Sequence, residues 1–377
     1  MSGLGGMVIL HLTCTYSAQT VTQELINQHN INMEQQRNIS FAGCGFIGIY
    51  HVGVSACLQL YASHLLQNKI GGSSAGAMVA LALASGNISL QEMTRKVAML
   101  AYEASNKPLG PFSPTFNLHQ LLATYLADSL PVDVAEKVSG RLFVSLTKAS
   151  NKGNLLVSNF RSKTDLIDAV CASSFVPIMS GWTPPRFRGE IALDGGYSDN
   201  IPLLGDVTLT VSPFAGDASI CPQDDTTANV FFRVPHGSGG CVDLSRENIN
   251  KLMKAMMPPD TTGMEALCCQ GFEDAKKYLM KEKMIRCKKC SRNQLSENCH
   301  DCTALIQEAK TKTLPKEMVQ VFEEIRELEY QKPRTGVRAY FVNFYSKCFC
   351  TLTFTLIPTM KLKGFRPTIE SCPFVNL

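Results

Sequence analysis

The chain has 377 residues, which is long enough for one large domain or two ordinary ones. It is 45% hydrophobic and 18% charged, so it can bury a sizeable core and does not have the composition of a disordered chain. The formal net charge of +4 is too small to argue for a nucleic-acid partner.

The cysteines and the apolar segments indicate which compartment to expect. The 15 cysteines are scattered and odd in number, unlike the framework of a small disulfide-rich secreted domain. Residues 7–12 form an apolar run, but no basic residue precedes it and it is too short for a convincing signal peptide. No stretch offers about 20 uninterrupted apolar residues, so no ordinary membrane span is expected. We therefore expect a cytoplasmic chain with mostly free thiols.

The first predicted elements follow a polar leader. Residues 1–37 are rich in Gln, Asn and Thr and show little periodicity, so we expect them to be poorly ordered. Residues 38–42 read as a short strand that runs into a glycine-rich loop at 43–48. A helix of mixed apolar character is predicted after that loop, over residues 48–66.

The glycine-rich loop has three readings. Gly43, Gly45 and Gly48 fit G-x-G-x-x-G between a strand and a helix, which is also the dinucleotide-binding fingerprint. That fingerprint requires an acidic residue about 20 positions later, and residues 65–70 contain none. The loop can instead present backbone N–H groups, including that of Cys44, to an oxyanion, an interaction worth about 3 kcal/mol. A tight turn needed only for packing ranks second, and the dinucleotide site third.

A serine stands at a predicted sharp turn. Residues 72–76 read G-S-S-A-G and fit G-x-S-x-G with Ser74 at the centre. Gly72 and Gly76 permit the close backbone approach that such a strand-to-helix elbow demands. Residues 75–84 are nearly all Ala, Leu, Met and Val and predict a buried helix. Its first turn directs unpaired N–H groups and a partial positive charge at Ser74, which we predict to be a nucleophile.

The middle of the chain alternates strands with helices, which predicts an α/β layered domain with a largely parallel sheet. The strands are expected at residues 141–147, 155–160, 191–193 and 208–211, and the helices at 91–105, 118–130, 164–172, 248–257 and 262–285.

A serine nucleophile needs a proton acceptor, and two arrangements are open. Asp194 opens D-G-G at the end of a predicted strand, which places a carboxylate on a loop with room beside it. Of the seven histidines, only His236 and His300 follow Asp194, as a Ser…Asp…His triad would require. Asp194 therefore accepts the proton directly, or His236 accepts it while Asp194 orients the imidazole. An Asp-Gly pair alone is more often only a turn.

Three motifs together resemble the patatin-like phospholipase family, and more narrowly its animal adipose triglyceride lipase and adiponutrin branch. They are N-I-S-F-A-G-C-G-F-I-G, then G-S-S-A-G, then L-D-G-G-Y-S-D-N-I-P, and the likeness covers roughly residues 38–285. The resemblance implies a three-layer α/β/α sandwich with a mostly parallel central sheet. It also implies a Ser74–Asp194 dyad without histidine, an oxyanion loop at 43–48, acyl-ester lipid substrates, no cofactor and a protein coactivator. Ser73 departs from the alanine usual in that branch.

Residues 286–377 are expected to form a C-terminal extension rich in Cys, basic and aromatic residues. Two C-x-x-C pairs, Cys287 with Cys290 and Cys299 with Cys302, could hold zinc, but a solvated linker is the favoured reading. Basic residues gather just before and within this region and could bind an anionic surface: Lys276, Lys277, Lys281, Lys283, Arg286, Lys288, Lys289 and Arg292. Residues 337–357 are aromatic and apolar and could contact lipid or pack as an edge strand.

The serine elbow and Asp194 favour an acyl-ester hydrolase, and the resemblance implies that it releases fatty acid from a neutral lipid or phospholipid. It would work from the cytoplasm, peripherally on a lipid droplet or membrane. A transacylase differs only in the alcohol that enters at the second step. A lipid-droplet binding protein with little turnover, competing for lipase partners, is the alternative from another class.

Overall fold

The computed structural model describes residues 37–223, 230–286 and 300–331. All of them fall within one compact unit, Met1–Pro333. The seven cysteines whose side chains are described are free thiols.

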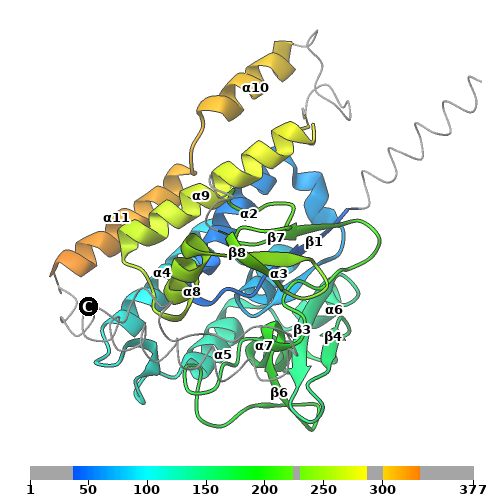
Figure 1. The fold of residues 1–377 in the computed structure, drawn as a ribbon, viewed down its shortest axis with the longest axis vertical. Helices are drawn as coiled ribbons and strands as arrows, with labels where there is room; N and C mark the ends of the chain where they lie inside the picture. The colour runs from blue at the N-terminus through cyan, green and yellow to red at the C-terminus, as the bar shows by residue number, and fades with distance from the viewer. Residues whose placement is uncertain (1–36, 224–229, 287–299, 332–377) are drawn as a thin grey trace, which may run out of the picture. The chain divides into compact units, whose positions relative to one another are not determined.

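A seven-stranded sheet forms the centre of this unit (Figure 1). The strands are β1 (Asn38–Phe41), β2 (Ile70–Ser73), β3 (Leu142–Lys148), β4 (Asn154–Val157), β5 (Arg186–Phe187), β6 (Glu190–Asp194) and β7 (Thr208–Val211). The neighbours β3-β2-β1-β7 are all parallel, as the alternation of elements predicts. The pairings of β3 with β4 and β6, and of β5 with β6, are antiparallel. A separate hairpin consists of β8 (Val230–Pro235) and β9 (Cys241–Ser245).

Helices pack on this sheet and on one another, so the predicted α/β sandwich of the patatin type is confirmed. They are α2 (Ile49–Tyr61), α3 (Ala75–Ser85), α4 (Leu90–Ser105), α5 (Leu118–Ser129), α6 (Val134–Val138), α7 (Lys163–Ser173), α8 (Arg246–Met256), α9 (Thr261–Lys281), α10 (His300–Thr311) and α11 (Lys316–Gln331), with the 3-10 turns η1 (Gly45–Gly48), η2 (Ser63–Gln67), η3 (Gly110–Phe112) and η4 (Gly195–Tyr197). Helix α3 lies against β1, β2 and β3, and α7 lies against β3, β5 and β6.

Local sequence accounts for where several helices begin. In each case a short polar side chain accepts a hydrogen bond from the backbone N–H three residues later, which satisfies a group that the helix itself leaves unpaired. These capping residues are Ser89, Asn117, Ser162, Ser245 and Asp260.

Helices α2 and α9 pack with their backbones in close contact. A Cβ atom on Gly53 would lie 1.9 Å from the carbonyl oxygen of Cys268, and one on Gly271 would lie 2.1 Å from that of Tyr50. Only glycine fits at both positions, so the two helices cross where neither has a side chain. Tyr50 also donates a hydrogen bond of 2.9 Å to Asp274 on α9.

Helix α11 belongs to the same packed unit as the sheet, although its residues fall in the predicted C-terminal extension. Met318, Val321, Phe322 and Ile325 are at most 1% exposed. They repeat at the spacing of one helix face, and α11 contacts α4 and α9. An ion pair of 2.6 Å joins Glu324 to Arg95, and another joins Arg326 to Glu265. Residues 316–331 therefore complete the core beside α9, where the sequence analysis expects an extension.

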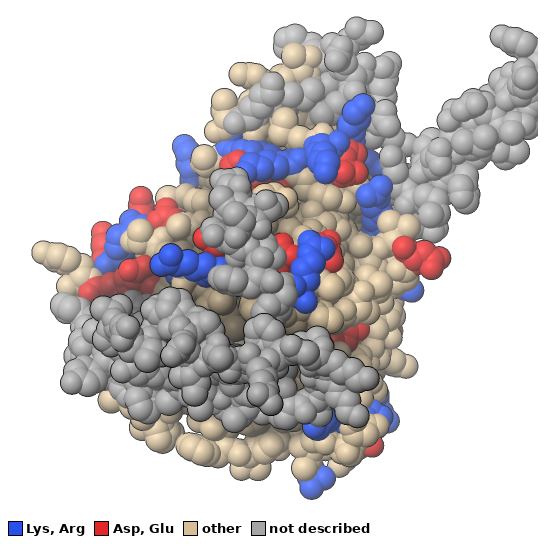
Figure 2. Space-filling view, in the orientation of Figure 1, with Lys and Arg blue, Asp and Glu red and all other residues tan. Residues whose placement is uncertain are grey.

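The basic residues near α9 do not all face solvent. Lys276 is 6% exposed and donates hydrogen bonds to Glu273 at 2.7 Å and to the carbonyl of Lys312 at 3.1 Å. Figure 2 shows Lys and Arg interspersed with Asp and Glu over this helix. The positive charge there is partly neutralised, which weakens the hypothesis of a basic lipid-binding face.

The sequence raises two further questions, whether a helix could span a membrane and whether side chains could hold a metal ion. Within the described ranges, no helix combines the length and apolarity that a membrane crossing requires. Those same ranges contain no group of three or more His, Cys, Asp or Glu side chains placed to hold a metal ion. The zinc hypothesis falls on Cys287, Cys290 and Cys299, which lie outside the described residues, and on Cys302, whose side chain is not described.

Candidate active site

Strand β3 brings the ends of two other strands together. Its residues 142–145 pair with β2, and residues 146–148 pair with β6. Because β4 pairs with residues 144–147 and overlaps both, β2 and β6 must lie on the opposite edge of β3 from β4. They run toward each other along that edge. Ser73 ends β2 opposite Ser145, and Asp194 ends β6 opposite Leu146. The residues that follow β2 and end β6 therefore meet.

Ser74 occupies a strained elbow at this junction. Its φ of 51° and ψ of −127° are unusual for a residue with a side chain, and it precedes α3 directly. Its backbone N–H donates to the hydroxyl of Ser173 at 2.9 Å, and that hydroxyl donates to the carbonyl of Ser145 at 2.7 Å. Gly72 and Gly76 are needed because an added Cβ would lie 2.3 Å and 2.2 Å from the carbonyl oxygen of Phe41. The elbow is thus held from β1, β3 and α7.

Asp194 is buried next to Ser74. It is 7% exposed, and Ser74 is 8% exposed. The side chain of Ser74 is close enough to the Asp194 carboxylate to lower its pKa, and this carboxylate accepts a hydrogen bond from the backbone N–H of Gly196 at 2.7 Å. Burial raises the pKa of Asp194 to about 6, although both contacts act to lower it. This carboxylate can therefore exchange a proton near neutral pH.

The glycine-rich loop lies beside this pair, and its glycines have different functions. A Cβ on Gly43 would lie 3.1 Å from the Cβ of Ser74, so the loop touches the elbow. The N–H of Gly43 is already engaged, since it donates to Asn200 Oδ1 at 3.0 Å. Gly45 has a φ of 54°, and a Cβ there would lie 2.3 Å from the carbonyl oxygen of Ala255 in α8. A Cβ on Gly48 would lie 3.0 Å from that of Ala75, so this glycine allows close packing against α3.

A buried histidine holds the same loop from another direction. His51 is fully buried, and its Nε2 lies 2.8 Å from the carbonyl oxygen of Ala42 and 3.3 Å from Cys44 Sγ. Because a carbonyl oxygen only accepts, Nε2 carries the proton. Burial lowers the pKa of His51 to about 4 and raises the pKa of the Cys44 thiol, so both groups are neutral.

His236, the alternative base, is bonded to a different residue. Its Nε2 contacts Asn200 Nδ2, its ring lies edge-on to Phe214, and burial lowers its pKa to about 4. The carboxylate of Asp194 contacts Ser74 and Gly196 instead. His300 begins α10, and nothing is described of its side chain.

Sequence reasoning missed Asn200 and Ser173 as members of the site. Both lie in segments that the resemblance includes, S-S-F-V-P-I at 173–178 and L-D-G-G-Y-S-D-N-I-P at 193–202. A buried polar side chain must be hydrogen-bonded, but its partner cannot be read from the chain alone. Asn200 is 157 positions from Gly43, which it contacts.

The comparisons with known proteins agree with this architecture. The sequence profile described as "Patatin-like phospholipase" matches residues 39–206. Human patatin-like phospholipase domain-containing protein 4 is 35% identical over 248 residues, which cover 65% of this chain and 97% of that protein. The chain belongs to the patatin-like phospholipase family.

Other relatives in the family are longer. Human patatin-like phospholipase domain-containing protein 2 is 41% identical over 255 residues, 67% of this chain and 50% of that protein. Human 1-acylglycerol-3-phosphate O-acyltransferase PNPLA3 is 39% identical over 264 residues, 69% of this chain and 53% of that protein. The chain thus spans about half the length of these two relatives. The expected resemblance to the branch with adipose triglyceride lipase and adiponutrin is confirmed.

The region that matches the family profile ends between Asp194 and His236, the two candidate bases. It contains Ser74, Asp194, Asn200 and the glycine-rich loop, and it ends at residue 206, before His236. The segment that supplies His236, together with α8 to α11, lies outside the region that the family profile matches.

Proposed function

We propose that this chain is a serine acyl-ester hydrolase or acyltransferase acting on glycerolipids, with Ser74 as nucleophile and Asp194 as general base. One observation carries the proposal. Ser74, at a strained elbow before a buried helix, lies next to the buried carboxylate of Asp194, whose pKa burial raises to about 6. Without its proton the serine oxygen is a strong nucleophile, and a carboxylate of this pKa can take that proton near neutral pH.

In the first half-reaction, Ser74 Oγ bonds to the ester carbonyl carbon while its proton passes to Asp194. The tetrahedral intermediate then breaks its bond to the alcohol, which leaves with the proton from Asp194. The acyl group stays on Ser74 as an ester. No metal or organic cofactor is required by these steps.

Backbone amides of the glycine-rich loop stabilise the oxyanion in this mechanism. The N–H of Gly43 is bonded to Asn200 and that of Ser74 to Ser173, so we assign this function to Cys44 and Gly45. The first turn of α3 adds a partial positive charge beside Ser74. The dinucleotide reading of this loop has no support in the match to the family.

The second half-reaction decides between hydrolysis and acyl transfer. Water activated by Asp194 releases a fatty acid, whereas a lipid alcohol in the same position yields a new ester. Relatives in the comparisons carry a phospholipase name and an O-acyltransferase name, so both acceptors fit the family. A lipid-droplet or membrane surface and a protein coactivator stay predictions of the resemblance.

A lipid-binding protein with little turnover is the second candidate, and one experiment separates the two. Purified protein is labelled with a fluorophosphonate and then assayed for acyl release from triacylglycerol, phospholipid and a dispersed short-chain ester, with glycerol and lysolipid as acceptors. We expect labelling and acyl release that Ser74→Ala abolishes, because Ser74 is the attacking group.

Two controls complete this experiment. Ser73→Ala should keep most activity, since this serine bonds to Asn200 and not to Asp194. His236→Ala should also keep most activity if Asp194 is the base. Loss of activity in a folded His236→Ala protein, or wild-type turnover in Ser74→Ala, would contradict the proposal.

A further inference from the structure

Asn200 holds Gly43 of the glycine-rich loop from both sides, since it contacts each of the two peptide units that flank this residue. Its Oδ1 accepts from the N–H of Gly43 at 3.0 Å, and its Nδ2 donates to the carbonyl of Gly43 at 3.0 Å. The side chain is 4% exposed and contacts the loop next to the elbow. It follows Asp194 by six residues, so one short segment supplies both the carboxylate and the clamp on the loop.

The orientation of the Asn200 amide is fixed by its partners. A backbone N–H can only donate, so the atom that faces it must be the oxygen, and Ser73 also donates to this oxygen at 2.6 Å. The nitrogen therefore faces the carbonyl of Gly43 and His236 Nε2. His236 must accept at Nε2 and carry its proton on Nδ1, which fits its lowered pKa. Every polar atom of the Asn200 side chain is thus satisfied.

We propose that Asn200 is a positioning residue that sets the direction of the Cys44 and Gly45 amides toward the oxyanion. This proposal rests on the function proposed above. The peptide that joins Gly43 to Cys44 starts at the carbonyl that Asn200 holds, so rotation of that carbonyl would turn the Cys44 N–H with it. Hydrogen bonds aimed at a developing charge stabilise it only when they are preorganised.

The Asn200 side chain can approach the loop this closely only because residue 43 is glycine. A Cβ on Gly43 would lie 2.5 Å from Asn200 Oδ1 and 2.6 Å from Ser73 Oγ, so glycine is required for the clamp to close. The loop is held at Ala42 and Cys44 by His51 and at Gly43 by Asn200. Removing Asn200 takes away the side-chain partner of both the N–H and the carbonyl of Gly43, which lie between those two contacts.

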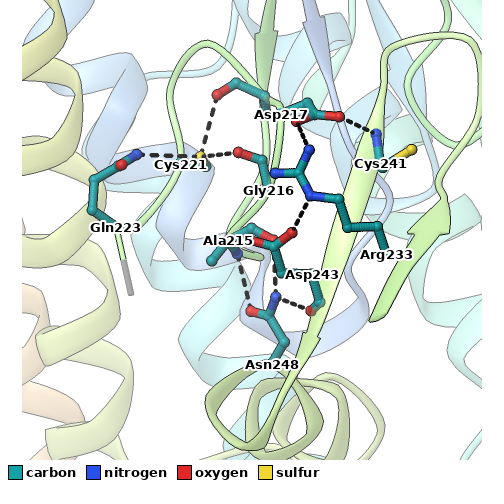
Figure 3. Close-up of polar contacts among 10 residues, drawn as sticks. Ala215, Gly216, Asp217, Cys221, Gln223, Arg233, Cys241, Asp243 and Asn248 are labelled. Carbon is teal, nitrogen blue, oxygen red and sulfur yellow. Dashed lines mark hydrogen bonds and ion pairs between the residues drawn. The ribbon is translucent and has the colours of Figure 1, made fainter. Parts of the chain in front are cut away.

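The chain contains a matched control for this clamp. Asn248 is also 4% exposed, accepts from the N–H of Ala215 at 2.9 Å and donates to the carbonyl of Ala215 at 2.9 Å (Figure 3). It lies in the first turn of α8, whereas the contact of α8 with Gly45 comes from Ala255 near the other end. Asn248→Ala therefore removes an equivalent buried clamp away from the elbow.

The test compares Asn200→Ala, Asn200→Asp, Asn248→Ala and Ser73→Ala with the wild-type protein on a dispersed short-chain ester. Both Asn200 variants should lower kcat about 100-fold, the usual effect of a misdirected catalytic group, with KM changed by less than about threefold. In Asn200→Asp, one carboxylate oxygen can still accept from the N–H of Gly43. The other oxygen replaces the Nδ2 donor and faces the carbonyl oxygen of Gly43, to which it cannot donate. In Asn200→Ala the acid limb of kcat/KM should keep its wild-type midpoint, because Asp194 is unchanged and no charge is added beside it.

The controls make the result decisive. Asn248→Ala should lower the melting temperature about as much as Asn200→Ala but keep kcat within about twofold, and Ser73→Ala should lose little. Wild-type kcat in a folded Asn200 variant would overturn the positioning role, as would an equal loss of kcat in Asn248→Ala. Activity in Ser74→Ala would instead overturn the proposed function, so the two failures are distinguishable.

Discussion

Asp194 has two properties that both come from its burial. Removing a carboxylate from water disfavours its charged form, and the contacts with Gly196 and Ser74 offset only part of that cost. The resulting pKa of about 6 makes Asp194 a better proton acceptor than an exposed aspartate while leaving it ionised at neutral pH. The same burial makes the ionised form costly for folding. Activity and stability should therefore depend on this group in opposite directions.

The pH dependence of turnover tests the first property. Protonated Asp194 cannot accept the proton of Ser74, so kcat/KM on a dispersed ester should fall about tenfold per pH unit below the midpoint. That midpoint should lie near pH 6. Initial rates with a neutral substrate measure it. If His236 were the base, its pKa of about 4 would keep the rate flat to much lower pH, and such a profile would contradict a dyad.

The stability of Asp194→Asn tests the second property. The folded pKa of about 6 lies above the unfolded value of 3.8. The wild-type protein therefore loses stability as pH rises from the lower value to the higher one. Asparagine carries no charge, so the variant should be more stable than wild type at pH 8, by up to about 3 kcal/mol, with the difference vanishing near pH 4. Thermal unfolding across this range measures the difference, and a difference that is constant with pH would count against a buried ionised carboxylate. The variant should nevertheless be inactive.

At the scale of elements, strand β3 determines how closely Ser74 and Asp194, the proposed reacting groups, approach each other. It places β2 and β6 end to end on one edge, so Ser74 and Asp194 meet without any long loop between them. Sites placed by rigid strands hold their geometry better than sites on loops. The turn after β6 must also stay close to β3, because a Cβ on Gly195 would lie 2.2 Å from the carbonyl oxygen of Ser145.

Gly195→Ala is therefore expected to displace Asp194 from Ser74. The clash is with backbone, which cannot move aside as a flexible side chain can. A displacement of about 1 Å can cost about 100-fold in kcat, and we expect a loss of that order together with a lower melting temperature. Gly153→Ala is the control, since a Cβ there meets only the Asn151 side chain, at 3.0 Å. Equal activity of the two variants would show that the β6 turn tolerates movement.

Some elements of the fold and site could be predicted from the sequence, and others could not. The G-S-S-A-G pattern and the apolar run after it predict the elbow and α3 because their requirements are local. The strand at residues 208–211 and the helices near 91–105 and 248–257 are found within a few residues of their predicted bounds. The antiparallel approach of β6, which brings Asp194 to Ser74, depends on pairing with a strand about 47 residues away. The bond that occupies the Gly43 N–H depends on Asn200, and no local pattern reveals it.

At the scale of the whole molecule, the packed unit extends beyond the region that the family profile matches. The profile match ends at residue 206, yet α9 packs on α2 and α11 packs on α4 and α9. The cysteines and basic residues dominate the pattern of residues 286–377, which therefore predicts one extension and hides the apolar face of α11. Periodic spacing of Met318, Val321, Phe322 and Ile325 was the signal that could have identified it.

Two truncations should therefore behave differently. A chain ending at residue 285 loses the α11 side chains that are buried in the core, and each such side chain contributes about 1.5–3 kcal/mol. We expect its free energy of unfolding to fall by on the order of 5 kcal/mol, with part of the activity lost on every substrate. Denaturant unfolding of this chain and of the full-length protein measures the loss.

A chain ending at residue 333, the end of the compact unit, should keep its melting temperature and its turnover on a dispersed short-chain ester. It lacks the aromatic and apolar residues 337–357, and on emulsified lipid we expect a loss that the dispersed ester does not reveal. Assays of both truncations on both substrates separate folding from interfacial contact. Equal loss on the two substrates after cutting at 333 would mean that the terminal residues support the core. Equal stability of the two truncated chains would mean that α11 contributes little to it.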